Sequence, residues 1–101
     1  MAESSCVYVV TYVPSGCTQF ALDDIVTTAC NEPCQDGIIG DGPCAGTQLT
    51  AVSSSCMMYP PEDGPMSQEA IDEALRRGRS GVGSTREIKS SEITGHYPAK
   101  R

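Results

Sequence analysis

Six cysteines within the first 56 residues constrain this 101-residue chain more than any other feature of its sequence. Their number is even, and they stand among Gly, Pro and Asp residues, which form turns and let loops close without strain. The sequence therefore predicts three disulfide bonds, formed by Cys6, Cys17, Cys30, Cys34, Cys44 and Cys56. Because six cysteines can pair in many ways, the connectivity stays open at this stage. Our working hypothesis joins Cys6 to Cys56, which would tie the first predicted strand to the last.

A shortage of large apolar side chains explains why such cross-links are needed. Val, Ile, Leu and Phe together supply 17 of the 101 residues. This share is below the ~20% under which strongly charged chains tend to stay disordered. Each disulfide that closes a loop of a dozen or more residues contributes ~3 kcal/mol, against the ~5 to 15 kcal/mol that stabilise a small domain. Three disulfides would therefore compensate for the small core.

Metal binding and catalysis are the other roles that clustered cysteines can have. Structural zinc sites usually contain two close pairs of ligands, but here only Cys30 and Cys34 are close in sequence. The single histidine, His96, lies in a polar tail and is interpreted as a solvated residue. A nucleophilic cysteine needs a neighbouring base or cation, and residues 1–66 contain no Lys or Arg. The sequence thus predicts no metal, no cofactor and no enzymatic activity, and free thiols in a reducing compartment remain the alternative to disulfides.

The charges divide the chain into two parts. Residues 1–66 carry eight carboxylates and no basic residue, whereas residues 67–101 carry five carboxylates and all seven basic residues. The acidic part repels nucleic acid, so we expect a cationic partner and no nucleic-acid binding. No apolar run approaches the ~18 residues of a membrane span, and the start of the chain lacks the positive segment of a signal peptide.

Alternating patterns predict strands in the first 66 residues, which we interpret as one acidic, cysteine-rich domain. Residues 6–13 carry apolar side chains on both alternating faces, which is typical of a central strand. Residues 46–59 predict a second strand. Between them, residues 35–44 contain Asp-Gly and Gly-Pro steps and predict a loop, in which two isoleucines form an apolar plug.

Two segments carry helix signals. Residues 23–34 begin with an Asp pair that can cap a helix and end near a proline, although their β-branched residues make a strand the rival. Residues 67–78 begin at Ser67, end at Gly78 and carry one apolar stripe, so they predict an amphipathic helix packed on the domain. Residues 79–101 predict a flexible or extended polar tail. The predicted fold class is α+β: a small disulfide-stapled domain with a short antiparallel sheet, one or two short helices and a polar C-terminal tail.

These features predict a secreted, disulfide-rich binding protein, such as a toxin, effector or inhibitor, that acts through surface contacts with a protein or cell-surface target. The alternative is an intracellular or viral accessory or regulatory protein, whose cysteines are reduced or hold a metal. In that alternative the C-terminal helix and tail bind the partner, although the helix can equally pack against its own sheet. The candidate partner-binding residues are Ile71, Leu75, Arg76 and Arg77.

Overall fold

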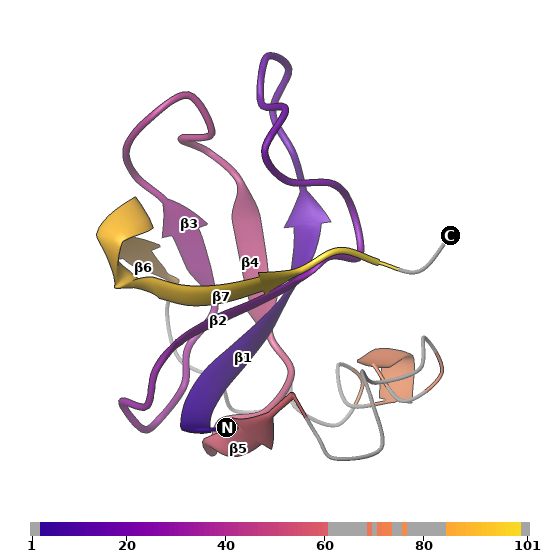
Figure 1. Cartoon of the computed structure of the whole chain (residues 1–101), viewed down its shortest axis with the longest axis vertical. Helices are drawn as coiled ribbons and strands as arrows, with labels where there is room; N and C mark the ends of the chain where they lie inside the picture. Colours follow the sequence, from indigo (N-terminus) through magenta and orange to yellow (C-terminus); the bar gives the residue numbers. More distant parts are fainter. Residues whose placement is uncertain (1–2, 61–68, 70, 74–75, 77–84, 100–101) are drawn as a thin grey trace.

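The protein folds as one strongly curled β-sheet (Figure 1). The computed structural model describes residues 3–60, 69, 71–73, 76 and 85–99. Strands make up 42% of the structure and helical residues 10%, so the predicted α+β class is wrong. The strands are β1 (Glu3–Tyr12), β2 (Ile25–Ala29), β3 (Gly37–Ile39), β4 (Gln48–Ala51), β5 (Met57–Tyr59), β6 (Arg86–Ile88) and β7 (Ile93–Tyr97).

The strand order brings the two edges of the sheet together. Along the sheet the order is β6-β3-β4-β1-β2-β7, and β5 pairs separately with β1. The pairs are antiparallel except for β3 with β6, which is parallel. The edge strands β6 and β7 are neighbours in the chain, joined through the 3-10 turn η1 (Ser90–Glu92). The sheet therefore curls until one short turn connects its two edges, and β7 crosses the front of the molecule in Figure 1.

Strand β1 lies at the centre of the sheet, as its sequence predicted. It pairs with β2 along one edge, and with β4 and β5 along the other. Both of its faces are buried, because Cys6, Tyr8 and Val10 point to one side and Val7 and Val9 to the other. Strands buried on both faces read as continuous apolar runs, which is why the pattern at residues 6–13 was informative.

The inner side of the curl holds the larger of two apolar clusters. Strand β6 contributes Ile88, whose side chain is fully buried, so the predicted polar tail supplies part of the core. We call this group the inner cluster, and its buried members are Cys6, Tyr8, Val10, Phe20, Val26, Cys34, Ile39, Cys44, Leu49, Ala51 and Ile88.

A second apolar group covers the other face of β1. This outer cluster consists of Val7, Val9, Ile25, Val52, Tyr59 and Ile71. Ile71 belongs to the segment predicted as a helix over residues 67–78, of which residues 69, 71–73 and 76 are described and are helical. Its side chain is buried in the cluster, so this residue packs against the chain's own sheet, as the alternative for the helix held.

Three other local predictions differ from the structure. Residues 25–29 form strand β2 rather than a helix, because their β-branched side chains are buried between two neighbouring strands. The predicted loop at 35–44 contains strand β3, in which Ile39 is buried and Ile38 is exposed. The predicted strand at 46–59 is divided into β4 and β5, which pair with different parts of β1.

The tail supplies the two edge strands and is held by polar contacts. Asp41 Oδ1, in the loop between β3 and β4, accepts hydrogen bonds from Ser90 N and Ser90 Oγ, both at 2.8 Å. Arg86 Nη1 lies 3.0 Å from Glu92 Oε1, which links β6 to η1. Residues 85–99 are therefore extended against the rest of the sheet, as one of the two predictions for the tail held, whereas residues 79–84 lie outside the described residues.

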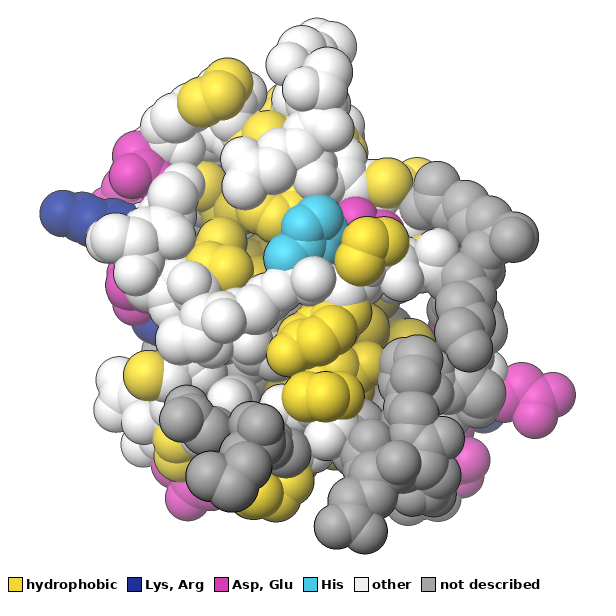
Figure 2. All heavy atoms as spheres, viewed as in Figure 1, with side chains coloured by type: hydrophobic (Ala, Val, Ile, Leu, Met, Phe, Trp, Pro, Cys, Tyr) yellow, Lys and Arg dark blue, Asp and Glu magenta, His cyan; other side chains and the backbone are white. Residues whose placement is uncertain are grey.

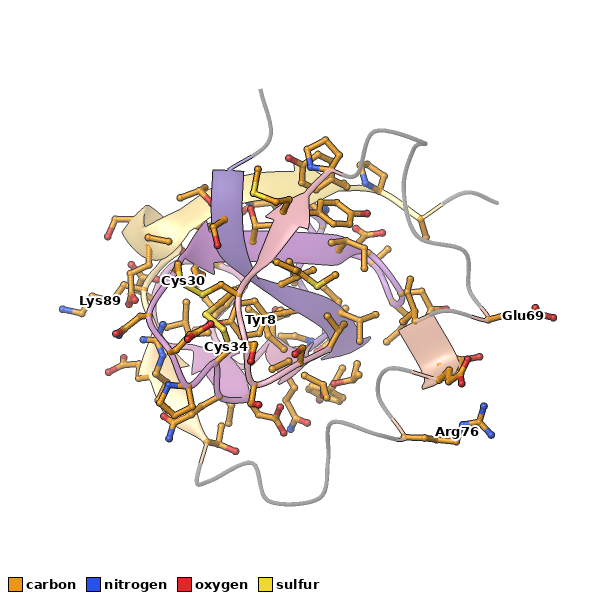
Figure 3. All side chains as sticks on the ribbon, turned by 90° about the horizontal axis from the view of Figure 1, so that it is seen from below. Tyr8, Cys30, Cys34, Glu69, Arg76 and Lys89 are labelled. Carbon is orange, nitrogen blue, oxygen red and sulfur yellow. A yellow bond between two sulfur atoms is a disulfide. The ribbon has the colours of Figure 1, made fainter. Side chains whose placement is uncertain are left out.

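All six cysteines form disulfides, as predicted. The bonds join Cys6 to Cys34, Cys17 to Cys44 and Cys30 to Cys56. The hypothesis that Cys6 bonds to Cys56 is wrong, although the segments approach as it supposed, since Ser5 of β1 pairs with Met57 of β5. Cys6 points into the inner cluster and meets Cys34 there, and Figure 3 shows Cys34 close to Tyr8.

We expect the native protein to be lighter than its reduced form by six hydrogen atoms, measured by intact-mass spectrometry with and without reductant. The bonds span 28, 27 and 26 residues, so each contributes ~3 to 4 kcal/mol by constraining the unfolded chain. Reduced and alkylated protein should therefore lose its cooperative urea transition. A cooperative transition that persists after complete alkylation would contradict this dependence.

The burial of Ile88 gives a test of the tail's place in the core. Ile88→Ala should lower the free energy of unfolding by about 2 to 5 kcal/mol, because it leaves a cavity in the inner cluster. Ile38→Ala is the matched control, since Ile38 is exposed on the neighbouring strand, and should cost less than about 1 kcal/mol. Equal losses in urea denaturation would place Ile88 outside the core.

Candidate functional site

A row of exposed side chains crosses three strands of the sheet. Tyr12 of β1 pairs with Gln48 of β4, and Gln48 pairs in turn with Ile38 of β3. Directly paired residues project from the same face of a sheet, so the three side chains stand side by side. Tyr12 is 50% exposed and Ile38 is 38% exposed. We call these three residues the exposed row.

An irregularity in β1 produces this arrangement. The register between β1 and β4 shifts between Val10 and Tyr12. Val10 pairs with Leu49 and points into the inner cluster, and without the shift Tyr12 would lie on the same face two residues later. The bulge turns Tyr12 to the outer face instead. Sequence alternation assigned Tyr12 to the face of Tyr8 and could not show this change.

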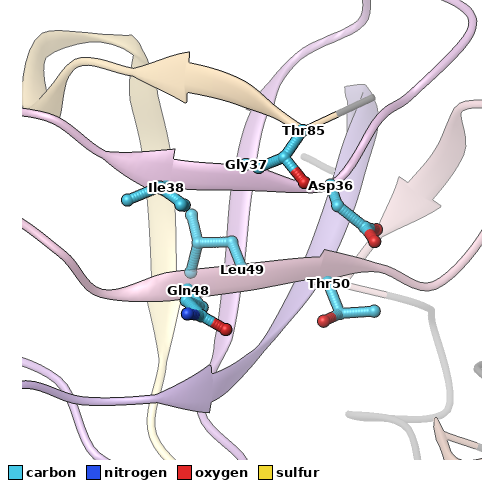
Figure 4. Close-up of a pocket in the computed structure, with 7 residues that line it drawn as sticks. All are labelled: Asp36, Gly37, Ile38, Gln48, Leu49, Thr50 and Thr85. Carbon is cyan, nitrogen blue, oxygen red and sulfur yellow. The ribbon is translucent and has the colours of Figure 1, made fainter. Parts of the chain in front are cut away.

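A groove of about 180 Å³ lies beside the exposed row, along β3 and β4 (Figure 4). Ile38, Gln48 and Thr85 form its exposed rim, and the buried Leu49 forms part of its base. The full lining is Asp36, Gly37, Ile38, Gln48, Leu49, Thr50 and Thr85. Gly37 has no room for a side chain, because a Cβ atom would collide with Ile88.

Hydrogen bonds fix the polar groups along the groove. Asp36 Oδ1 accepts a hydrogen bond from Ala51 N at 2.9 Å, which holds the carboxylate at one end. The hydroxyl groups of Thr50 and Thr11 lie 3.0 Å apart and share a hydrogen bond. The surface therefore combines a carboxylate, hydroxyls and an amide with the apolar side chains of the exposed row. Such a surface can hold an extended peptide by apolar contacts and directed hydrogen bonds.

A second polar site joins Asp24 to the end of the chain. Asp24 is 4% exposed, and His96 Nε2 lies 2.8 Å from its Oδ2 atom. The same carboxylate accepts hydrogen bonds from the backbone N–H groups of Ala21 and Ala99, each at 3.0 Å. Burial raises the pKa of Asp24, but the hydrogen bonds from Ala99, His96 and Ala21 outweigh burial and hold this pKa below its usual 3.8.

The sequence missed this role of His96. It was interpreted as a solvated tail residue, whereas strand β7 pairs it with Val26 of β2 and leaves its side chain 28% exposed. Its ring packs edge-on against Phe20, with centroids 4.9 Å apart. Figure 2 shows the histidine in the middle of one face, next to hydrophobic side chains. The 72 residues between His96 and Asp24 left no local signal of the contact.

Two of the three disulfides lie next to each other. Cys34 Sγ, of one bond, is 3.9 Å from Cys56 Sγ, of another. The spacing of the cysteines in the sequence argued against a metal site, but the fold gathers sulfurs that are far apart in the chain. The sulfurs of Cys6, Cys34 and Cys56 all lie within 4.8 Å of one another.

The predicted partner-binding residues at 71–77 receive partial placement. Arg76 is exposed and points away from the sheet, as Figure 3 shows. Ile71 is buried in the outer cluster. Leu75 and Arg77 lie outside the residues whose side chains are described. Their role in partner binding stays a prediction.

A scan against protein-family models found no match, and searches of curated proteins and of solved structures found no significant match either. Within the described residues, no helix is both long enough and apolar enough to cross a membrane. The functional argument consequently starts from the geometry of the sites themselves.

The hydrogen bonds to Asp24 lead to an expected pH dependence of stability. The pKa of Asp24 is lower in the folded than in the unfolded chain, so its contribution is present above about pH 4 and is lost as pH falls through the folded pKa. Asp24→Asn should flatten the decline of unfolding free energy below about pH 4. Asp23→Asn is the matched control, because Asp23 is exposed and its positive φ of 72° suits Asn equally well.

The measurement is urea denaturation of the wild type and both variants at several pH values between neutral pH and pH 2. Identical slopes for the wild type and Asp24→Asn would show that Asp24 does not contribute to acid sensitivity.

Proposed function

We propose that this chain is a secreted, disulfide-stabilised binding protein that recognises a protein or cell-surface target through the exposed row and its groove. A toxin, an effector or an inhibitor would act in this way, and no catalytic step is part of the proposal. The observation that carries it is the cross-strand placement of Tyr12, Gln48 and Ile38 beside the groove. Exposed aromatic and aliphatic side chains on a rigid sheet are typical of protein contact surfaces.

The disulfides support the extracellular part of the proposal. Three disulfides in a chain of this size are typical of proteins from oxidising environments, where thiols are not kept reduced. They also fix the loops on either side of the exposed row, because Cys17 follows β1 and Cys44 precedes β4. A preorganised surface loses little conformational entropy when it binds.

The charge of the chain indicates the chemistry of the target. Residues 1–66 carry eight carboxylates and no Lys or Arg, and the groove contains Asp36. A target segment with an apolar side chain and a neighbouring Lys or Arg would contact Ile38 and Tyr12 with the former and approach Asp36 with the latter. Complementary charge of this kind increases the rate of association and the specificity.

Peptide-display panning against the immobilised native protein tests the proposal. We expect enriched peptides that combine apolar and basic residues. Ile38→Asp should weaken the binding of synthetic copies at least ~10-fold, because it places a charge in the apolar contact. Met58→Asp is the matched control, since Met58 is 56% exposed on β5, outside the exposed row, and should leave the affinity unchanged.

Two results would contradict the proposal. One is enrichment of peptides whose affinity is unaffected by Ile38→Asp. The other is equal loss with Met58→Asp and Ile38→Asp, which would indicate non-specific adhesion to exposed apolar side chains.

A further inference from the structure

Four sulfur atoms gather on one side of β1, from two disulfides that the sequence keeps far apart. Cys34 Sγ and Cys56 Sγ, which belong to different bonds, are 3.9 Å apart. Cys6 Sγ lies within 4.8 Å of both. Cys30 is bonded to Cys56 and completes the group. Neither Cys17 nor Cys44 belongs to a metal-compatible group among the described residues.

The sulfurs form a compact group rather than a line. Exchange between the two disulfides would require Cys56 Sγ to approach Cys34 Sγ along the axis of the bond to Cys6. The distance from Cys56 Sγ to Cys6 Sγ would then equal the sum of 3.9 Å and the 2.10 Å bond, but it is at most 4.8 Å. The arrangement is therefore poorly suited to exchange.

A tetrahedral metal site has the geometry that the sulfurs do approach. Zinc binds thiolates at about 2.3 Å, which places the ligand sulfurs of a tetrahedron about 3.8 Å apart. We propose that, once these two disulfides are reduced, Cys6, Cys30, Cys34 and Cys56 bind one Zn²⁺ ion as a four-thiolate site. The ion would connect the same four chain positions that the two disulfides connect. The inference does not rest on the proposed binding function.

The chemistry of this conversion balances with a phosphine reductant. Each disulfide accepts two electrons, the phosphine takes the oxygen atom of one water molecule and becomes a phosphine oxide, and the two hydrogens of that water end on the two sulfurs. Four thiols then bind Zn²⁺ and release four protons, because the thiolate is the form that ligates the metal.

Contacts that do not involve disulfides hold the ligand positions. Cys6 stays in the β1 ladder opposite Thr28. Cys34 N donates a hydrogen bond to Ser54 O at 2.7 Å, and Cys56 N donates one to Glu32 Oε2 at 2.7 Å. These contacts bring the segments before β3 and before β5 together when the disulfides are open. Glu32 is therefore a positioning residue for Cys56.

Burial differs across the group and indicates how the ion enters. Cys6 and Cys34 are 2% and 1% exposed, whereas Cys30 is exposed and Cys56 is partly exposed. Reductant and metal can reach the group from the side of Cys30. Two buried thiolates without a counterion would be strongly destabilising, and the divalent cation supplies the compensating charge.

The test uses the full-length chain, reduced with phosphine under anaerobic conditions and titrated with Co²⁺, whose visible spectrum reports tetrahedral thiolate coordination. We expect one Co²⁺ per chain, a thiolate charge-transfer band of four-thiolate intensity, and displacement by one equivalent of Zn²⁺. Glu32→Gln should leave the intensity of this band unchanged. A weaker band in that variant would mean that Glu32 is a ligand and would overturn the four-thiolate assignment.

Two cysteine variants separate this site from general thiol binding. The double variant Cys17→Ser, Cys44→Ser should keep the wild-type stoichiometry and spectrum. Cys56→Ser should raise the apparent Kd for Co²⁺ more than about 100-fold, since even loss of an outer-shell partner costs 10- to 100-fold. The absence of a tetrahedral spectrum in reduced wild type, or equal weakening by both variants, would overturn the proposal.

Discussion

The burial of β1 on both faces is the constraint on which the rest of this structure depends. A chain with few large aliphatic residues places Val7, Val9 and Val10 in one strand, and each face of that strand then needs a cover. The curled sheet covers one face and a segment containing Ile71 covers the other. Because the covering segments come from distant parts of the chain, local strand pairing alone would hold them weakly.

The disulfides solve this problem for the first 56 residues. The three closed loops overlap, because each bond begins before the preceding loop ends, and together they link the segments from Cys6 to Cys56. The C-terminal strands contain no cysteine and are held in another way. Ile88 packs in the inner cluster, Asp41 binds Ser90, and Asp24 binds His96 and Ala99. Covalent and non-covalent constraints thus divide the sheet between them.

The two candidate sites depend on this framework in different ways. The exposed row exists because a bulge in β1 turns Tyr12 outward beside Gln48 and Ile38. The sulfur group exists because β5 runs beside the start of β1 and brings Cys56 next to the bond between Cys6 and Cys34. One site presents side chains to a partner, and the other determines how the chain responds to reduction. Both arise from strand pairing across long sequence separations.

The sequence by itself determined the features that depend on composition and local pattern. The even cysteine count predicted the disulfides, and apolar alternation on two faces predicted a central strand at 6–13. Tertiary structure decided the disulfide pairing, the strand rather than helix at Ile25–Ala29, and the place of residues 85–99 in the sheet. The physical reason is that helix and strand propensities differ by less than the free energy of burial between neighbouring strands. The exposed row, the contact of His96 with Asp24 and the sulfur group likewise require residues that only the folded sheet brings together.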